Sequence, residues 1–481
     1  MKLRFKLYGR PVALSRLASR KLSKAAICSC AALLLCALVP PATRAQTFTS
    51  LLSFNGTDGA NPFFSVLAQG TDGNLYGTTS ARGSHGKGTV FKITPSGTLT
   101  TLYSFCAKSK CTDGSVPYGG LVLGTDGNFY GTTFSGGTLG VGTVYKITPA
   151  GKLTTLHSFN FSDGYNPYDA LIQATDGNFY GTTQFGGAHL LGNVFKMTPQ
   201  GVVTNLHSFN SSDGSEPEAG VIQGSDGNFY GTTYNGGSSG SYGTVFKMTP
   251  EGVLTTLHFF SDETDGRAIV SGLVEASDGN FYGTASLGGP LGYGTIYTIT
   301  PAGALTVLHN FDTTDGSSPN LLLLGTDGNF YGTTISSGAN GDGTVFEITP
   351  QGALTTLHNF DKTDGDLPFA GPAQGTNGNL YGVTQFGGSK SDGTVFQLGV
   401  GLGPFVKTVP ASGKAGASVT ILGNKLTGAT SVSFNGTPAT FKIVSATEIT
   451  TTVPAGATTG TVQVNTPGGT LFSNLVFQVI Q

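Results

Sequence analysis

One nine-residue phrase recurs through most of this chain and constrains its fold more than any other feature. In its fullest form the phrase runs from Thr175 to Thr183, as Thr-Asp-Gly-Asn-Phe-Tyr-Gly-Thr-Thr, and it returns six more times with small changes. The spacings between its anchor residues are 54, 50, 50, 52, 49 and 50, the anchors being Asp72, Asp126, Asp176, Asp226, Asp278, Asp327 and Asn377. A period near fifty residues is typical of β-propellers and solenoids.

Each repeat reads as four short strands. In the third repeat, residues 170–173 and 179–183 flank the turn Asp176-Gly177-Asn178, and residues 193–197 and 202–209 flank the turn at Pro199-Gln200-Gly201. Both turns have the residues that tight turns favour, with Pro presetting φ and Gly accepting a positive φ. Four antiparallel strands in about fifty residues are typical of one propeller blade.

The two ends of the repeat region complement each other. A lone fourth strand, residues 47–54, precedes the first repeat, and a third strand, residues 393–398, ends the last one. We predict that the N-terminal strand completes the last blade and closes a seven-bladed β-propeller without an exposed inner edge. A solenoid would instead need capping repeats at both ends, and the sequence has no such repeats.

Composition supports an all-β protein. The 481 residues include 75 Gly, only 11% are charged, and no stretch has the pattern of a long amphipathic helix. The first 45 residues differ, because they contain nine basic residues and no acidic one. An apolar run from Ala25 to Val39 follows most of these basic residues. We expect residues 1–45 to be a signal peptide cleaved before Gln46, and the alternative is a retained membrane anchor.

Cleavage would leave 16 of the 25 Lys and Arg residues against 27 Asp and Glu, a formal charge of −11. A chain this acidic is not expected to bind nucleic acid. It would keep two cysteines, Cys106 and Cys111, for which a disulfide is the expected state in an oxidising compartment. We expect a monomer that is secreted, either extracellular, associated with the cell surface, or periplasmic. We expect it to have no metal, no cofactor and no stable membrane insertion.

Two kinds of titratable residue recur at fixed positions of the repeats. Histidines occupy one position of the fourth strand in five repeats, where Leu52 and Tyr103 replace them in the other two, so a packing role is expected: His157, His207, His258, His309 and His358. An Asp-Gly pair opens each loop between blades, from Asp58 to Asp364. These carboxylates could collect cations or a basic partner, but the pair is also ordinary turn chemistry, which we favour.

Length changes locate the expected binding face. They fall in the loops between blades and in those between second and third strands, two sets that emerge on one face of an up-and-down blade. Aromatic residues of the loops between blades are candidate ligand contacts, through stacking on sugars or anchoring of a protein: Phe63, Phe64, Tyr118, Tyr165, Tyr168 and Phe369. The alternative is that they cover the ends of the blade interfaces.

The innermost strands end in a row of amides, Gln69, Gln173, Gln223 and Gln374, which Glu275 joins. We expect these side chains near the central channel, with Glu275 as a candidate binding residue. One carboxylate does not make an acid and base pair, so no catalytic residue is predicted.

Two resemblances add to this interpretation. Residues 405–479, through Gly413-Lys414-Ala415-Gly416, Val419 to Gly423 and Thr466-Pro467-Gly468-Gly469, resemble the IPT/TIG immunoglobulin-like domains, which implies a small β-sandwich for residues 403–481. Residues 47–398, through the phrase and the Gly-Thr-Val-Phe-Lys-Ile-Thr-Pro that follows it, resemble the GloVer tandem repeats of secreted bacterial proteins. The domains are therefore expected at 1–45, 46–402 and 403–481.

Two functions fit the sequence. The first is a secreted or cell-surface, non-enzymatic binding or adhesion protein, whose propeller loops bind a glycan or an extracellular protein and whose IPT/TIG domain is a spacer or accessory binding module. The second is a polysaccharide lyase or hydrolase with a site at the channel mouth. An enzyme would need unique polar residues that converge, and in the sequence these residues, including Glu216 and Glu218, are scattered over several repeats.

Overall fold

The computed structural model describes residues 46–237 and 242–480. Within these ranges the chain is built of β-strands, with one 3-10 helix, η1 (Ser109–Cys111), so the all-β class is confirmed. The expected signal peptide, residues 1–45, lies outside the described ranges. Among the described residues, no helix has the length and apolar character needed to cross a bilayer.

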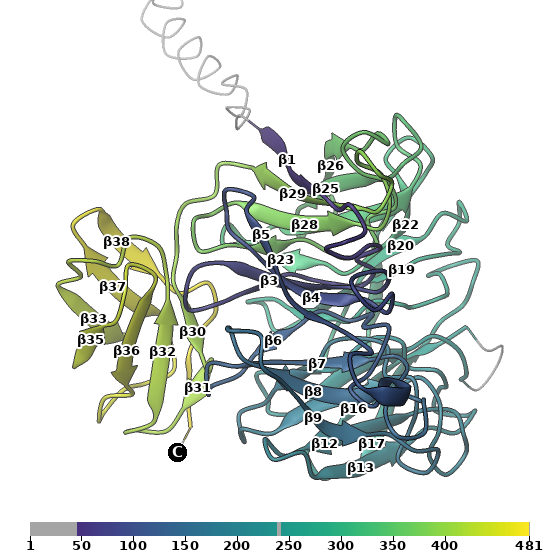
Figure 1. Ribbon diagram of the computed structural model, residues 1–481, viewed down its shortest axis with the longest axis horizontal. Coiled ribbons are helices and arrows are strands. Elements are labelled where there is room, and N and C mark those ends of the chain that lie inside the picture. The colour runs from purple at the N-terminus through teal and green to yellow at the C-terminus, as the bar shows by residue number, and fades with distance from the viewer. Residues whose placement is uncertain (1–45, 238–241, 481) are drawn as a thin grey trace, which may run out of the picture. The chain divides into compact units, whose positions relative to one another are not determined.

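The repeat region folds into seven antiparallel sheets of four or five strands, counted over the described residues (Figure 1). The first strands of the repeats are short: β2 (Ala68–Gln69), β6 (Val122–Leu123), β10 (Ile172–Gln173), β14 (Ile222–Gln223), β18 (Val274–Glu275), β23 (Leu323–Leu324) and β27 (Ala373–Gln374). The second strands are β3 (Leu75–Thr79), β7 (Phe129–Thr133), β11 (Phe179–Thr183), β15 (Phe229–Thr233), β19 (Phe281–Ala285), β24 (Phe330–Ser336) and β28 (Leu380–Thr384).

The third strands are β4 (Thr89–Ile93), β8 (Thr143–Ile147), β12 (Asn193–Met197), β16 (Thr244–Met248), β20 (Thr295–Ile299), β25 (Thr344–Ile348) and β29 (Thr394–Gly399). The fourth strands are β5 (Leu99–Ser104), β9 (Leu153–Ser158), β13 (Val203–Ser208), β17 (Leu254–Phe259), β21 (Leu305–Asn310) and β26 (Leu354–Asn359). In the sixth repeat a further strand, β22 (Ser317–Pro319), pairs with β24. First strands are shorter than predicted; in the third repeat the Ala170 N–H donates to the Asp169 side chain instead of a neighbouring strand.

The recurring phrase builds a polar network around its Asp. In the third repeat, Asp176 accepts hydrogen bonds from the Asn178 backbone N–H at 3.0 Å and from its side-chain amide at 2.8 Å. The Tyr180 hydroxyl donates to the same carboxylate at 2.9 Å, and Lys196 forms an ion pair with it at 2.8 Å. Gly177, with φ 80°, supplies the left-handed residue of the turn. The phrase is therefore a structural device that joins the turn to strands β11 and β12.

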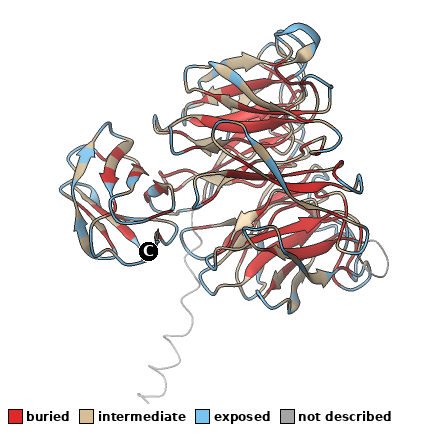
Figure 2. Ribbon diagram, turned by 90° about the horizontal axis from the view of Figure 1, so that it is seen from below, coloured by how far each residue is buried: buried red, intermediate tan, exposed pale blue. Residues whose placement is uncertain are grey.

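The same Tyr also joins neighbouring repeats. Its ring stacks on the first aromatic residue of the next repeat's phrase, with centroids 4.1 Å apart for Tyr180 and Phe229. Four other stacked pairs repeat this contact at 3.9–4.2 Å: Tyr76 with Phe129, Tyr130 with Phe179, Tyr230 with Phe281, and Tyr282 with Phe330. In the last repeat, Tyr381 shares a hydrophobic cluster with Leu75 of the first. Figure 2 shows how the strands carry most of the buried residues and the loops most of the exposed ones.

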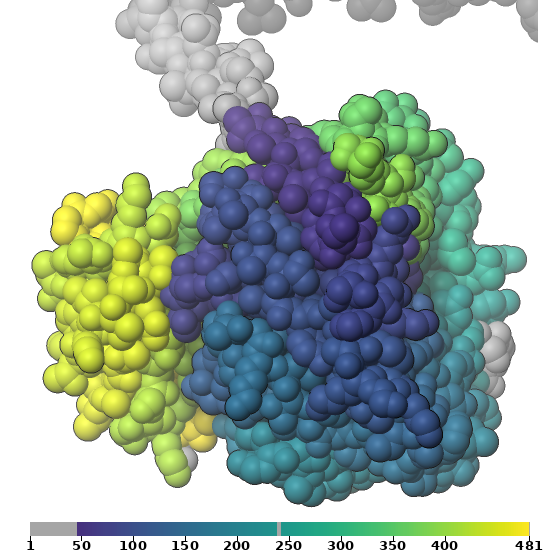
Figure 3. All heavy atoms as spheres, in the orientation of Figure 1, coloured from purple at the N-terminus to yellow at the C-terminus, as the bar shows by residue number. Residues whose placement is uncertain are grey.

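The N-terminal strand β1 (Thr47–Ser53) pairs with β29 and completes the sheet of the last repeat. Its register shifts between Ser50 and Leu52, so it has a bulge like the one between β12 and β13. The Pro-x-Gly turn of a repeat lies against the fourth strand of the preceding sheet: a Cβ atom on Gly201 would lie 2.5 Å from the Leu156 carbonyl oxygen. The turn of the first repeat lies against β1 in the same way, since a Cβ atom on Gly97 would lie 2.7 Å from the Leu51 carbonyl oxygen. Strand β1 thus takes the place of a fourth strand, beside the green β29 in Figure 1 and against green residues in Figure 3.

The C-terminal residues form two further four-stranded sheets. One has the order β30 (Lys407–Val409), β32 (Ser418–Leu422), β36 (Glu448–Thr452), β35 (Phe441–Ile443), and the other β34 (Thr437–Ala439), β33 (Ser431–Phe434), β37 (Val462–Thr466), β38 (Gly469–Phe472). Strands β31 (Ser412–Gly413) and β39 (Gln478–Val479) pair in parallel. A buried core that includes Ile421, Phe434 and Val464 joins the two larger sheets. The predicted strand over 475–479 is wrong for Leu475 and Val476, which are exposed and unpaired in these sheets, whereas Phe477 is buried and forms an antiparallel bridge with Gly460.

Candidate functional site

The loops between repeats and the loops between second and third strands lie together. Within one repeat they are joined by isolated antiparallel bridges, such as Tyr165 with Phe185. The same bridge recurs in five other repeats: Ala60 with Ala81, Ser115 with Ser135, Ser215 with Asn235, Arg267 with Leu287, and Asp366 with Phe386. The two variable sets of loops therefore share one face, as the pattern of length changes indicates.

One loop residue in every repeat has a left-handed backbone. It is the third residue after the loop Asp, and its φ lies between 52° and 57°: Asn61, Val116, Asn166, Glu216, Ala268, Ser318 and Leu367. Non-glycine residues adopt this conformation at an energetic cost, so the surrounding structure must hold it. A hydrogen bond to the preceding repeat does so, as from the Asn166 N–H to the Val141 carbonyl at 2.8 Å. The corresponding bond of Asn61 reaches Asp392 in the last repeat at 2.9 Å.

Four loops have an aromatic residue two positions after this left-handed residue, at Phe63, Tyr118, Tyr168 and Phe369, and Phe64 and Phe134 join them. We call Phe63, Phe64, Tyr118, Phe134, Tyr168 and Phe369 the aromatic cluster. Ring centroids lie 4.7 Å apart for Phe63 and Phe369, 5.0 Å for Phe63 and Tyr118, and 5.3 Å for Tyr118 and Tyr168. All six side chains are half-buried, and they come from the seventh, first, second and third repeats. They therefore form one partly exposed apolar surface rather than six separate caps.

Two of the predicted binding residues lie elsewhere. The Tyr165 ring packs on Phe185 and Phe161, with ring centroids 5.4 Å and 5.3 Å apart. These three rings form a separate aromatic group within one repeat. Glu275 accepts a hydrogen bond from the Ser225 N–H at 2.8 Å and another from the Ser225 hydroxyl at 2.5 Å. Its carboxylate thus holds the turn of the preceding repeat by hydrogen bonds, as the Gln223 side-chain oxygen does when it accepts from the Thr175 N–H. The expectation that Glu275 faces a ligand in the channel is not supported by these contacts.

Glu218, which in the sequence is one of several scattered unique polar residues, borders the aromatic cluster. Glu218 occupies the loop position that holds Phe63, Tyr118, Tyr168 and Phe369 in other repeats. Its carboxylate accepts a hydrogen bond from the Gln184 side chain at 2.7 Å. Burial raises the pKa of Glu218 to about 7, and the nearby charge of Glu216 adds to the shift. Counting the residue after each loop Pro would have shown that Glu218 falls in line with the aromatic positions.

A second carboxylate, that of Asp169, lies near the Tyr168 phenol, as that of Glu218 does. Burial, followed by the charge of Glu218 and then weaker contributions that include Asp169, raises the pKa of the Tyr168 phenol. Asp169 accepts hydrogen bonds from the Gly220 N–H at 2.9 Å and from its own neighbour Ala170 at 2.7 Å, and burial raises its pKa too. Asp169, Phe64 and Phe369 also line a narrow cavity with about 10 Å³ open to the centre of a water molecule, roughly enough for one water.

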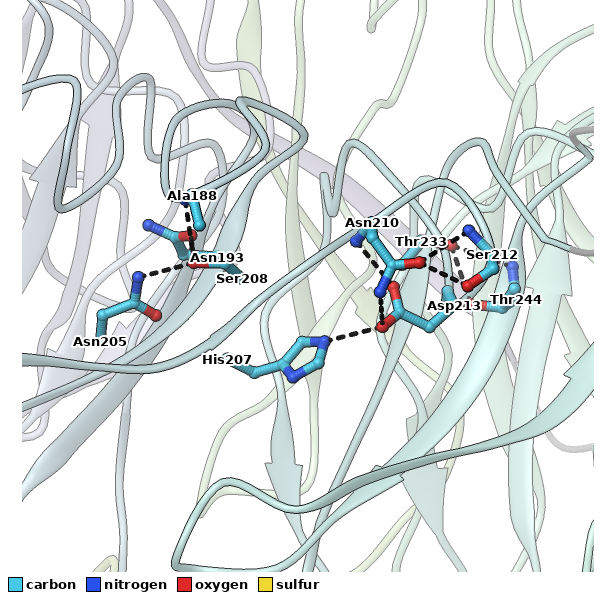
Figure 4. Close-up of polar contacts among 10 residues, drawn as sticks. All are labelled: Ala188, Asn193, Asn205, His207, Ser208, Asn210, Ser212, Asp213, Thr233 and Thr244. Carbon is cyan, nitrogen blue, oxygen red and sulfur yellow. Dashed lines mark hydrogen bonds and ion pairs between the residues drawn. The ribbon is translucent and has the colours of Figure 1, made fainter.

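The repeated His and loop Asp residues form pairs rather than a shared site. His207 Nε2 lies 3.1 Å from Asp213 Oδ2, and the Asn210 amide donates to the same oxygen at 2.8 Å (Figure 4). The four other His residues make the same contact within their own repeats, at 2.7–3.1 Å. Where Tyr103 replaces His, its hydroxyl donates to Asp113 at 2.7 Å. The packing role expected for His is therefore incomplete, because each ring also fixes a loop carboxylate.

Cys106 and Cys111 form the predicted disulfide. It closes the longest loop between repeats around Asp113, which accepts hydrogen bonds from the Ala107 and Lys108 backbone N–H groups. Over residues 46–237 and 242–480, no group of three or more His, Cys, Asp or Glu side chains is arranged to hold a metal ion.

The buried charge of Glu218 leads to a prediction about stability. A carboxyl whose pKa rises from 4.5 to about 7 on folding contributes stability below pH 4.5, and this contribution is lost as pH rises toward 7. We expect Glu218→Gln to unfold less readily than the wild type near pH 8, by on the order of 2 kcal/mol, and the difference to vanish near pH 4. Denaturant unfolding at both pH values measures this.

The matched control is Glu275→Gln, because Gln occupies the equivalent position in four other repeats and can keep one hydrogen bond to Ser225. A Glu218→Gln variant whose stability relative to the wild type is the same at both pH values would contradict the prediction.

Comparisons with known proteins agree with this architecture. The Gloeobacter/Verrucomicrobia repeat matches residues 39–241 and 219–437, and the IPT/TIG domain matches residues 404–479. The comparison with curated proteins finds no match. Among solved structures, a streptogramin B lyase is similar with a TM-score of 0.53 and 15% identity, over 75% of this chain and 99% of that one.

Two further structures have TM-scores of 0.48. One is a fungal alcohol oxidase of the AA5 family in complex with copper, at 13% identity over 91% of this chain and all of that one. The other is PorZ, a bacterial surface component of the type-IX secretion system of Porphyromonas gingivalis, at 14% identity over 89% of this chain and 61% of that one. At such identities, the likeness to the streptogramin B lyase shows a propeller-like fold and no shared activity.

Proposed function

The chain belongs to the Gloeobacter/Verrucomicrobia repeat family, and we propose that it is a secreted or cell-surface protein that binds a glycan through its aromatic cluster. In this proposal residues 1–45 are a cleaved signal peptide, residues 46–402 form the propeller, and residues 403–481 are a spacer or accessory binding module. The IPT/TIG match and the disulfide are compatible with a role outside the cytoplasm.

We further infer that the seven sheets are the blades of a closed ring. Contacts between the first and last repeats support this, because they repeat contacts made between consecutive repeats. Gln69 and Thr376 are joined by hydrogen bonds of 3.0 and 3.1 Å, as Gln173 and Thr125 are joined at 2.9 and 3.3 Å. In such a ring the loop position that follows Pro in six of the seven repeats stands at the mouth of the central channel.

The observation that carries the binding proposal is the convergence of the aromatic cluster. Six half-buried rings from four repeats leave a partly exposed apolar surface, and Glu218 with Gln184 adds polar groups at its edge. Aromatic faces stack on the apolar faces of sugar rings, while neighbouring polar groups orient hydroxyls. Five of the six rings come from loops whose backbones are held in a strained conformation, which favours a preformed site.

We expect replacement of two rings to abolish most glycan binding. Each buried aromatic anchor contributes on the order of 1–2 kcal/mol, so Tyr118→Ala with Tyr168→Ala should weaken binding by at least about 30-fold. The measurement is retention on a panel of immobilised polysaccharides, followed by calorimetry with the polymer that is retained. Tyr165→Ala is the matched control, because Tyr165 is a half-buried loop Tyr outside the cluster. Equal loss in the control and the double variant, or no retention on any polysaccharide, would refute the proposal.

A polysaccharide-acting enzyme is the second candidate. It is favoured by one observation, that Glu218 and Asp169 are both near the Tyr168 phenol and both have raised pKa values. Such groups can act as general acids or bases near neutral pH. Analysis of the retained polymer for shortened products distinguishes the two functions, since turnover that is lost in Glu218→Gln would replace binding with catalysis.

A further inference from the structure

The chemistry around the aromatic cluster narrows the class of ligand. The loop position after Pro holds aromatic rings in four consecutive repeats of the ring, at Phe369, Phe63, Tyr118 and Tyr168. The next repeat has Glu218 there, and the two remaining repeats have Asn320 after Pro319 and Val270 after Ile269, which replaces the Pro. This loop position is therefore aromatic in four consecutive repeats and acidic in the repeat that follows them, although all seven loops have the same left-handed backbone residue.

The acidic edge has no counter-charge of its own. In the described ranges, Arg82 pairs with Asp392 and Arg267 with Asp262, and no Lys or Arg forms an ion pair with Glu218 or Asp169. The Gln184 amide is the side-chain donor to Glu218. Burial with so little compensation raises the pKa of Glu218 to about 7, and a cation beside it would remove that penalty.

An ammonium group satisfies both halves of this surface. Aromatic faces attract cations through their negative quadrupole, an interaction that strengthens where water is excluded, and a carboxylate beside them adds a charged hydrogen bond. A neutral sugar would use the rings but leave the carboxylate uncompensated.

We propose that the aromatic cluster and Glu218 recognise a polysaccharide that carries free amino groups, that is, a polymer of amino sugars that are not N-acetylated. The inference rests on the proposed glycan-binding function and specifies its ligand. Sugar rings would stack on Tyr118 and Tyr168, and an ammonium group would face the Glu218 carboxylate.

The test compares a glucosamine hexasaccharide with its fully N-acetylated counterpart, by calorimetry on residues 46–481 near pH 7, where the sugar ammonium and the Glu218 carboxylate can be charged together because each favours the ionised form of the other. We expect the amine form to bind at least about tenfold more tightly, and added salt to weaken its binding selectively. Glu218→Gln should remove most of this preference while leaving the affinity for the N-acetylated form nearly unchanged. Glu275→Gln, which changes a carboxylate that clasps the neighbouring turn, should keep the preference.

Equal or weaker binding of the amine form, including no binding of either hexasaccharide, overturns the inference, as does a preference that survives in Glu218→Gln. Tighter binding of a lysine oligomer than of the amine sugar also overturns it, because the cation would then come from a basic protein. If neutral polysaccharides are retained in a manner that depends on Tyr118 and Tyr168, the proposed function stands without this inference. If no polysaccharide of either kind is retained, both fall.

Discussion

A chain that lacks residues 46–54 is expected to unfold at least about 10 °C below the chain that begins at residue 46. These residues contain β1, the fourth strand in the sheet of the last repeat. Removing them leaves one edge of β29 without its antiparallel partner from Thr47 to Ser53. An unpaired edge of this kind is a template for aggregation, so we also expect reduced solubility.

Packing adds to the loss of strand pairing. Phe54 is fully buried in a cluster with Leu67 and Phe91 of the first repeat and Tyr381 of the last. Emptying such a site costs about 3–5 kcal/mol for a buried Phe. Phe48 stacks on His358 with centroids 3.6 Å apart, so the deletion also uncovers the neighbouring fourth strand β26. Because the deletion affects both the first and the last repeats, its effect should exceed that of losing one strand at a free end.

Thermal unfolding followed by circular dichroism measures the effect, with static light scattering for aggregation. A synthetic peptide of residues 46–56 should raise the unfolding temperature of the shortened chain in a concentration-dependent way. The same peptide with Phe48, Leu52 and Phe54 replaced by Ser should not. An unchanged unfolding temperature in the shortened chain would mean that β1 contributes little to holding the two ends of the repeat region together.

The strands were predictable because the signals are local and repeated. The Asp-Gly-Asn and Pro-x-Gly turns fix where strands end, and the complementary ends of the repeat region indicated that residues 47–54 pair with the last repeat, as β1 does with β29. Five of the six predicted aromatic residues meet in one cluster, since equivalent positions of neighbouring repeats converge. The sixth, Tyr165, precedes the left-handed residue Asn166 and therefore stays within its own repeat.

The interactions that sequence reasoning missed depend on side-chain direction. In the sequence the His row and the loop Asp row are separate features, and the contact of His207 with Asp213 is visible only once strand and loop are both placed. Glu275 is on the correct strand, but its carboxylate reaches sideways to Ser225 of the preceding repeat. In the sequence Glu218 is one of several scattered unique polar residues, because its significance comes from the Tyr168 ring beside it.

The second large effect concerns the stacking between repeats. Tyr180 is about 1% exposed, stacks on Phe229 of the next repeat and donates to Asp176 of its own turn. We expect Tyr180→Ala to lower the free energy of unfolding by about 3–5 kcal/mol, because a cavity opens between two sheets that cannot close around a ring of this size. Denaturant unfolding measures the change, and a loss below about 1 kcal/mol would show that the stacked pair is dispensable.

Removing only a hydroxyl separates the polar contribution from the packing, and two Tyr residues should respond in opposite directions. Tyr180→Phe takes a donor from the Asp176 carboxylate and should cost about 1 kcal/mol. Tyr145 is fully buried on the third strand of its repeat, and within the described residues its hydroxyl has no hydrogen-bond partner. Tyr145→Phe should therefore be neutral or stabilise by up to about 1 kcal/mol, the more so because Phe occupies the equivalent position in neighbouring repeats, at Phe91 and Phe195. No loss in Tyr180→Phe would mean that ring packing, and not the Asp network of the repeated phrase, accounts for the Tyr at position 180, and a loss in Tyr145→Phe would contradict the expectation for the unpaired hydroxyl.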